Sequence, residues 1–165
     1  SGFICINWSL IMNSSIKAVF DKYSNYNYLD ASVADADYHI KSQKEFDDLN
    51  GGICWDFIKP ISSFLSANYI VSYSFFTGVY KDNKLIASHT YVIASCEEKL
   101  YWIECAWQDH KGIHTIDSFS EIEELLKEFY DADEVHTSIY NPYKSDGLTA
   151  NEFIDYVEDH GIELS

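Results

Sequence analysis

Three consecutive segments rich in Tyr, Val, Ile, Phe and Trp, separated by two short polar turns, constrain the fold more than any other feature of the sequence. The segments cover residues 69–80, 85–95 and 100–107, and the turns are residues 81–84 and 96–99. β-Branched and aromatic residues favour strands, and turns of this length join antiparallel neighbours. The middle of the chain is therefore predicted to form an antiparallel meander.

Helical patterns flank this meander. A capping box formed by Ser42 and Glu45 should open a short helix that ends at the glycine pair 51–52, and a second helix should follow from Cys54 to about Ala67. The remaining expected elements are helices at 14–23, 120–130 and 149–160, a strand at about 134–140 and a loop through about residue 37. The acidic run 121–124 is interpreted as a solvated helix face. This order of elements predicts an α+β fold.

Length and composition favour one domain. The chain has 165 residues, 47% of them hydrophobic and 16% aromatic, which suffices to bury a core. It contains no repeat or low-complexity linker, so residues 1–165 are predicted to form a single domain with a motif-bearing core at about 38–110. Residues 1–11 precede the only methionine, Met12, and are interpreted as an added segment or the cut end of a longer protein.

The charge of the chain excludes some classes of partner. Eleven basic residues, all of them lysine, stand against 27 acidic residues, for a net charge of −16. A chain without arginine lacks the bidentate reader of phosphate and guanine, and its negative field repels polyanions and anionic membranes. We therefore expect no nucleic-acid partner, whereas a protein or peptide substrate is compatible with this charge.

Targeting signals are not evident in the sequence. No segment reaches the roughly 18 consecutive apolar residues that a membrane span needs. Segment 3–12 is apolar but lacks the basic start and the small-residue cleavage site of a signal peptide. A cytoplasmic location without a membrane span is predicted. The spacing of the four cysteines matches neither a zinc site nor a redox pair, so reduced thiols are expected at Cys5, Cys54, Cys96 and Cys105.

Two histidines superficially resemble metal ligands. His110 and His114 are four residues apart, close to Asp109 and Asp117, in a predicted loop around Gly112. They lack a third ligand of clear spacing. No metal site is predicted, and no cofactor is expected.

Cys54 is the candidate nucleophile because it lies at a predicted helix start, directly after the glycine pair 51–52. A helix N-terminus presents unpaired N–H groups and the positive end of the dipole, which favour a thiolate. The glycines let the backbone turn sharply and approach a substrate, and backbone N–H groups there can stabilise the oxyanion that forms when a carbonyl is attacked. The alternative interpretation is a buried structural cysteine.

A histidine and a glutamate on consecutive predicted strands are the candidate base and acid. With residues 96–99 as the turn, His89 lies opposite Ala106, and Glu104 is its diagonal neighbour on the same face, within reach of its side chain. A carboxylate there can hold one imidazole nitrogen so that the other faces the cysteine. A register slip of one residue would place Glu104 on the opposite face. Taken singly, each residue could instead be an ordinary member of a sheet.

Three short motifs surround these residues. They are residues 52–57 (GICWDF), 89–92 (HTYV) and 102–107 (WIECAW), and together they resemble the transglutaminase-like superfamily of cysteine proteases, deamidases and acyl transferases. The resemblance covers less than half of the chain. It implies a papain-like α+β fold in which a nucleophile-bearing helix packs on an antiparallel β-sheet.

The resemblance also implies roles for individual residues: Cys54 as nucleophile, His89 as general base and Glu104 as orienting acid. Members of the family usually carry aspartate and then proline where this chain has Glu104 and Cys105, so Asp109 is kept as a fallback acid. Candidates for the second oxyanion donor or for substrate contact are Gln43, Asn50 and Trp55.

The implied activity is cysteine-dependent acyl transfer or hydrolysis at a peptide or glutamine-type amide through a thioester. Protease, deamidase and transglutaminase activities share this intermediate. Two alternatives remain open at this level. One is a catalytically inactive, transglutaminase-like protein-binding module, in which Glu104 would point away from His89. The other is a cell-wall peptide hydrolase of the NlpC/P60 type.

Overall fold

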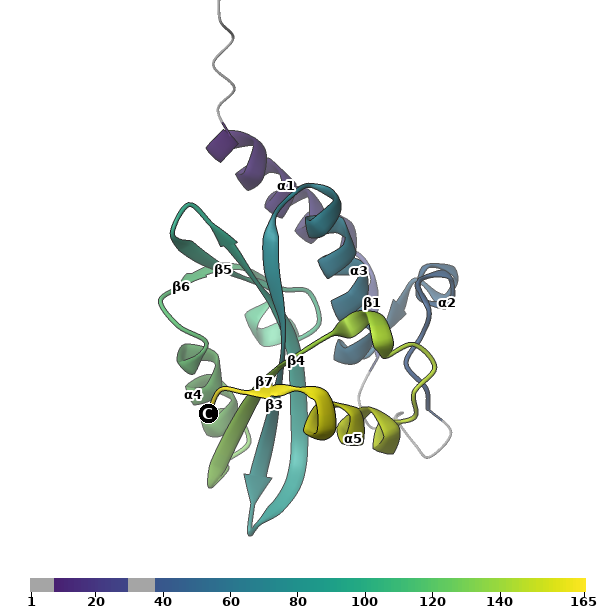
Figure 1. Cartoon of the computed structure of the whole chain (residues 1–165), viewed down its shortest axis with the longest axis vertical. Coiled ribbons are helices and arrows are strands. Elements are labelled where there is room, and N and C mark those ends of the chain that lie inside the picture. Colours follow the sequence, from purple (N-terminus) through teal and green to yellow (C-terminus); the bar gives the residue numbers. More distant parts are fainter. Residues whose placement is uncertain (1–7, 30–37) are drawn as a thin grey trace, which may run out of the picture.

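The computed structural model describes residues 8–29 and 38–165 (Figure 1). Its helices are α1 (Trp8–Tyr23), α2 (Gln43–Leu49), α3 (Cys54–Ala67), α4 (Ser120–Phe129) and α5 (Ala150–His160), with single 3₁₀ turns η2 (Gln108–His110) and η3 (Pro142–Lys144). Its strands are β1 (Asn27–Tyr28), β2 (Gly51–Gly52), β3 (Val71–Lys81), β4 (Lys84–Cys96), β5 (Lys99–Glu104), β6 (Gly112–Ile116), β7 (Glu134–Tyr140) and β8 (Ile162–Glu163).

A twisted antiparallel sheet forms the centre of the described part of the chain. Its strand order is β6-β5-β4-β3-β7-β8, and β1 pairs separately with β2 in parallel. Helix α3 packs on one face of the sheet with α1 beside it, and α4 packs on the other face (Figure 1). The predicted α+β fold, with the cysteine-bearing helix on an antiparallel sheet, is confirmed.

Alternation along β4 divides the core into two layers. Val92 and Ala94 pack against α3, whereas Tyr91 and Ile93 pack with residues of α4 such as Leu126. Successive side chains of a strand point to opposite faces, so a sheet that is covered on both sides reads as a nearly continuous apolar run. This explains why β4 is buried over most of its length.

The two predicted turns join the strands of the meander, and the second turn sets the register of β4 and β5, whereas the register of β3 and β4 shifts by one residue between Val79 and Tyr80. Residues 82–83 and 97–98 have positive φ between 50° and 65°, as two-residue type I′ hairpin turns require. Ser95 pairs with Leu100, and Val92 pairs with Ile103, as predicted. The predicted register is confirmed for the paired residues 92–96 and 99–103, and its extension by two residues places Glu104 on the same face as His89. The predicted position of His89 opposite Ala106 is wrong, because β5 ends at Glu104.

Some boundaries differ from the prediction. Helix α1 begins at Trp8 rather than at residue 14, and β5 ends at Glu104 rather than at 107. The loop predicted around Gly112 is wrong, because η2 and the edge strand β6 occupy this region and β6 pairs with β5. Residues 30–37 of the predicted loop and Cys5 lie outside the described residues.

None of the helices within residues 8–29 and 38–165 is both long enough and apolar enough to cross a membrane.

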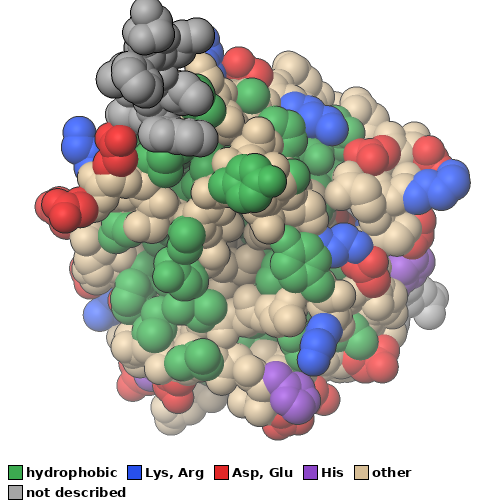
Figure 2. Space-filling view, turned by 45° about the horizontal axis from the view of Figure 1, so that its top comes forward, with side chains coloured by type: hydrophobic (Ala, Val, Ile, Leu, Met, Phe, Trp, Pro, Cys, Tyr) green, Lys and Arg blue, Asp and Glu red, His purple; other side chains and the backbone are tan. Residues whose placement is uncertain are grey.

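Hydrophobic side chains gather on one face of the molecule (Figure 2). The exposed aromatic residues at the junction of α3 and β3 include Tyr69, which is 92% exposed, and Tyr73.

Candidate active site

The structure brings Cys54, His89 and Glu104 together where α3 begins and β5 ends. Cys54 is the first residue of α3, and His89 lies on β4, with Glu104 at the end of the neighbouring strand β5. The Nε2 atom of His89 lies 2.5 Å from Oε1 of Glu104, and Cys54 lines the same cavity as His89 and contributes to raising the pKa of its imidazole. Because Nε2 is engaged by the carboxylate, Nδ1 is the ring nitrogen left for the cysteine.

Four N–H donors converge on the Glu104 carboxylate. Oε1 accepts from His89 and from Nε1 of Trp102, at 3.3 Å, whereas Oε2 accepts from the backbone N–H groups of Ala106 and Trp107, both at 3.0 Å. Because an ionised carboxylate only accepts hydrogen bonds and has room for about four, it matches this set of four N–H donors. The two backbone bonds also turn the chain out of the sheet, which explains why β5 ends at Glu104.

The surroundings of His89 favour the imidazolium. The side chain is buried, and burial alone would lower its pKa. The negative charge of Glu104 and the hydrogen bonds to Cys54 and Glu104 more than offset burial and raise the pKa of His89 to about 10. An imidazolium beside a cysteine favours the thiolate.

This raised pKa predicts a pH dependence of stability. The folded-state pKa of His89, about 10, lies above the ordinary value of 6.5, so the folded protein holds the proton more tightly than the unfolded chain. The stabilisation is fully present below about pH 6.5 and is lost as the pH rises toward 10. The free energy of unfolding of wild type relative to His89→Gln should therefore fall between these values, by at most about 1.4 kcal/mol per pH unit. Denaturant titrations across this range measure it, and a constant difference would contradict the prediction.

A cavity of about 350 Å³ opens beside the cysteine. Its lining combines Cys54 and His89 with polar and aromatic side chains: Tyr28, Ser88, Trp107, Gln108, Asp109, Leu126, Phe129 and Tyr130. The Trp107 ring meets the imidazole edge to face at 5.4 Å between centroids, and Phe129 packs edge to face on Trp107 at the same distance. A ligand of modest size can thus reach the sulfur between aromatic walls. Asp109, the fallback acid, lines this cavity, whereas Glu104 makes the contact with His89.

The three predicted oxyanion or substrate candidates do not line this cavity. The Nε2 atom of Gln43 donates to the carboxylate of Asp47, and Asn50 is the exposed left-handed residue that ends α2. Trp55 is buried against Phe153, with ring centroids 4.8 Å apart, and its Nε1 has no hydrogen-bond partner among the described residues. Besides Cys54, His89 and Asp109, which were predicted, the cavity is lined by residues that the sequence did not single out as site residues. Those of α4 and Tyr28 lie far from any motif, so no sequence signal could have found them.

A larger cavity, of about 540 Å³, lies away from Cys54, His89 and Glu104. It is lined by serine, tyrosine and aliphatic side chains of α3, β3, β7 and η3, including Ser72, Tyr73 and Tyr143. It contains no residue of the Cys54 site. We therefore assign the candidate site to the smaller cavity, which Cys54 and His89 both line.

The other described cysteines are packing residues. Cys105 is buried on the α3 side of the sheet, and burial together with the charge of Glu104 raises the pKa of its thiol to about 12. Burial also raises the pKa of Cys96. Their thiols are therefore poor nucleophiles.

The two histidines that superficially resembled metal ligands are His110 and His114. Their rings pack against Trp102, and Nε2 of His114 lies 2.6 Å from the carbonyl oxygen of His110.

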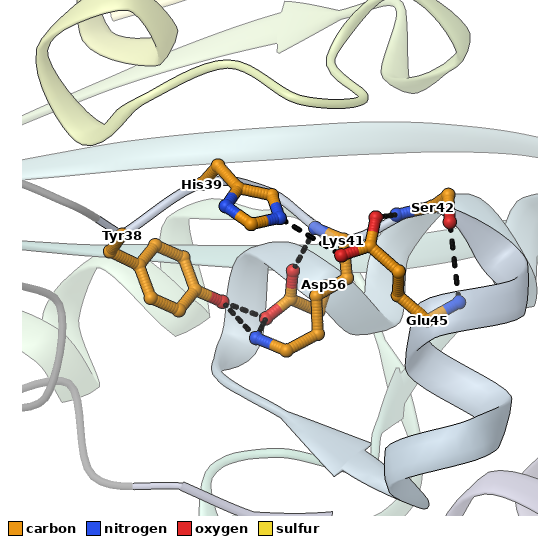
Figure 3. A network of polar contacts seen from close by, with 6 residues as sticks. All are labelled: Tyr38, His39, Lys41, Ser42, Glu45 and Asp56. Atoms are coloured by element: carbon orange, nitrogen blue, oxygen red, sulfur yellow. Dashed lines mark hydrogen bonds and ion pairs between the residues drawn. The ribbon is translucent and has the colours of Figure 1, made fainter.

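A buried carboxylate anchors the start of the cysteine helix (Figure 3). Asp56 lies in the first turn of α3, and its Oδ2 accepts from the backbone N–H of Ile53 at 3.0 Å, which caps the helix. Oδ1 accepts from the backbone N–H of Lys41 at 2.8 Å, and the Tyr38 hydroxyl donates to Oδ2. The segment that precedes α2 is thereby tied to the turn that carries Cys54. Figure 3 also shows the Ser42–Glu45 capping box of α2, which confirms the predicted helix start.

Gly52 leaves the space that Asp56 occupies. A Cβ atom at Gly52 would lie 2.5 Å from Oδ2 and 2.6 Å from Cβ of Asp56. Gly52→Ala is therefore expected to displace the carboxylate and to lower the free energy of unfolding by about 2 kcal/mol. Gly147→Ala is the control, because it adds backbone strain at φ 77° but meets no atom within 4 Å, and about 1 kcal/mol is expected. Urea unfolding measures both. A loss at Gly52 no larger than that at Gly147 would contradict this prediction.

Comparison with known proteins assigns no family. No family model and no curated protein matches the chain. Two solved structures align with it. An arylamine N-acetyltransferase C from Bacillus anthracis is 17% identical, with a TM-score of 0.42, over 58% of this chain and 41% of its own. An arylamine N-acetyltransferase from Bacillus cereus, described as having a unique Cys-His-Glu catalytic triad, is 14% identical, with a TM-score of 0.47, over 83% and 59%. The chain thus spans less than two thirds of either protein.

Proposed function

We propose that the chain is a cysteine-dependent enzyme that transfers or hydrolyses an acyl group, taken from a peptide or glutamine-type amide, through a thioester on Cys54. The observation that carries this proposal is the contact chain from Cys54 through His89 to Glu104, at the wall of an open cavity. Side chains that only fill the core are mostly apolar, whereas here a buried carboxylate accepts four N–H hydrogen bonds, one of them from a buried imidazole.

The residues divide the chemistry as follows. The Cys54 sulfur attacks the substrate carbonyl carbon after its proton passes to His89. Backbone N–H groups at the start of α3, other than that of Asp56, which donates to Ile53, would stabilise the resulting oxyanion. The imidazolium returns the proton to the leaving amine or ammonia, which leaves a thioester. Water or an amine then attacks the thioester carbonyl, with His89 again as base. Glu104 holds Nε2 throughout, so that Nδ1 serves the sulfur.

The geometry favours this proposal over a non-catalytic binding module. Such a module could keep the motif while Glu104 points away from His89, but the two side chains are in hydrogen-bond contact at 2.5 Å. A binding module also does not require the cysteine to lie at the wall of a cavity. The NlpC/P60-type alternative shares the same chemistry and differs in substrate.

The test is to trap the acyl-enzyme. The full chain is incubated with p-nitrophenyl acetate, and peptide mass spectrometry locates the acetyl group. The expected result is one acetyl group on Cys54, removed by neutral hydroxylamine as a thioester, and absent in Cys54→Ala. Ammonia release from glutamine-containing peptides then tests the amide specificity. Acetylation of surface lysines alone, equal in both proteins, would refute the enzyme proposal.

A further inference from the structure

A chain of buried hydroxyl groups leads from α4 to the aromatic ring that lies on His89. The Tyr91 hydroxyl is 2.8 Å from Oγ1 of Thr77, which is 2.8 Å from Oγ1 of Thr137. Thr137 donates in turn to Oε2 of Glu123 at 2.7 Å. The four side chains are buried, and they join β4, β3, β7 and α4 across the sheet. None of them touches the cavity at Cys54.

The direction of every proton in this chain is fixed by counting donors. Each hydroxyl has one proton, and that of Thr137 goes to the Glu123 carboxylate. Thr77 must therefore donate to Thr137, and the Tyr91 hydroxyl must donate to Thr77. Burial raises the pKa of Tyr91, so its hydroxyl keeps the proton that it donates. All three O–H dipoles thus point toward one carboxylate, and aligned hydrogen bonds polarise one another.

The far end of this chain meets the imidazole. Tyr91 and His89 are two residues apart on β4, so they share a face, and their rings stack with centroids 5.7 Å apart and planes inclined by 23°. Phe75 lies on Tyr91 at 5.3 Å, with planes 3° apart, and holds the ring in place. A phenol that donates a strong hydrogen bond gains electron density in its ring, and an electron-rich ring attracts a cation on its face.

We propose that Tyr91 is a positioning residue of the Cys54 site, and that the hydroxyl chain ending at Glu123 makes its ring a better partner for the His89 imidazolium. The inference rests on the proposed function, since it concerns the same base. The charged or titratable groups that face His89 from other elements are Cys54 and Glu104, and Tyr28, Asp109 and Tyr130 line the same cavity. Glu123 acts on the imidazole only through the chain.

Three variants interrupt the chain at different points without touching Cys54, His89 or Glu104. Tyr91→Phe keeps the ring and removes its hydroxyl, Thr77→Val removes the middle link, and Glu123→Gln keeps an acceptor for Thr137 but removes the charge. Ser62→Ala is the matched control, because it deletes another buried hydroxyl, bonded to Ser74 at 3.1 Å, that takes no part in the chain.

The readout is the titration of His89, followed by NMR of the histidine Cε1 signals and assigned with His89→Gln. Each of the three variants should lower the pKa of His89 by about half a unit. Ser62→Ala should leave it unchanged, whatever its effect on stability. Stability losses in all four variants with an unchanged His89 pKa would overturn the inference.

The same data separate this inference from the proposed function. If wild-type His89 titrates near 6.5 and Cys54 reacts like a free thiol, the proposed function fails. If wild-type His89 and Cys54 behave as an activated pair but the three variants titrate like wild type, only the role of Tyr91 fails.

Discussion

His89→Ala is expected to slow the alkylation of Cys54 by iodoacetamide about 100-fold at pH 7. In the proposed mechanism the His89 imidazole receives the Cys54 proton and stays beside the sulfur as a cation, held by the Glu104 contact at Nε2, 2.5 Å away. The thiolate is the species that reacts. Without the imidazole, Cys54 retains the helix N-terminus as its remaining local source of stabilisation, which supplies far less than a paired cation. The rate is measured by quenching at intervals and quantifying the Cys54 peptide by mass spectrometry.

The molecule supplies the controls for this measurement. Cys105 is an internal reference in every sample, because burial raises the pKa of its thiol to about 12 and it should react slowly in all variants. His136→Ala removes a half-exposed histidine that pairs with Glu134 and should leave the Cys54 rate unchanged. Equal rates in wild type and His89→Ala would mean that the imidazole does not activate the sulfur, and the binding-module alternative would then be preferred.

The positions of Cys54, His89 and Glu104 were predictable because they depend on local signals in the sequence. Two acidic residues at 97–98 form a two-residue turn, which sets the register of β4 and β5, and the register in turn places Glu104 on the face of His89. The helix start at Cys54 follows from a glycine pair and a helical apolar repeat. Each of these signals lies within a few residues of the feature that it specifies.

Features that depend on distant contacts were not predictable in the same way. The acidic run 121–124 was expected to face solvent, yet Glu123 is buried because two hydroxyl groups, from Thr137 and Ser165, donate to it. A partner on another strand cannot be inferred from helical periodicity. The strand β6 was missed for a related reason: Gly112 reads as a chain breaker, whereas pairing with β5 holds it at the end of an edge strand.

Asp56 shows how such a distant contact bears on the site. In the sequence, Asp56 is a member of the 52–57 motif, two residues after Cys54. In the structure, its carboxylate accepts hydrogen bonds from Lys41 and Tyr38, which lie 15 and 18 residues earlier in the chain. The Lys41 ammonium lies 3.5 Å from Oδ2, and its side chain is 10% exposed. It also lies 4.4 Å from the centre of the Tyr38 ring. The carboxylate is thus the common acceptor of two backbone groups, one hydroxyl and one cation.

Asp56→Ala is therefore expected to lower the free energy of unfolding by about 3–5 kcal/mol. The substitution leaves the backbone N–H groups of Ile53 and Lys41 without their acceptor, and it leaves the nearly buried Lys41 ammonium without its counter-ion. Buried donors and charges that lose their partners carry their full desolvation cost. Because Ile53 precedes Cys54, the first turn of α3 should also loosen. Urea unfolding measures the loss in stability, and Cys54 alkylation in the folded fraction measures the effect on the site.

Asp48→Ala is the matched control for this prediction. It removes an aspartate whose partner, Lys44, lies four residues away on the exposed face of α2, with the two side chains 62% and 84% exposed. Such a pair contributes at most about 0.5 kcal/mol. If Asp56→Ala cost no more than Asp48→Ala, water would be satisfying the released groups, and the segment that starts at Tyr38 would not need the cysteine helix to hold it. A large loss confined to Asp56, together with slower alkylation of Cys54, would show that the buried carboxylate links the stability of this segment to the geometry of the nucleophile.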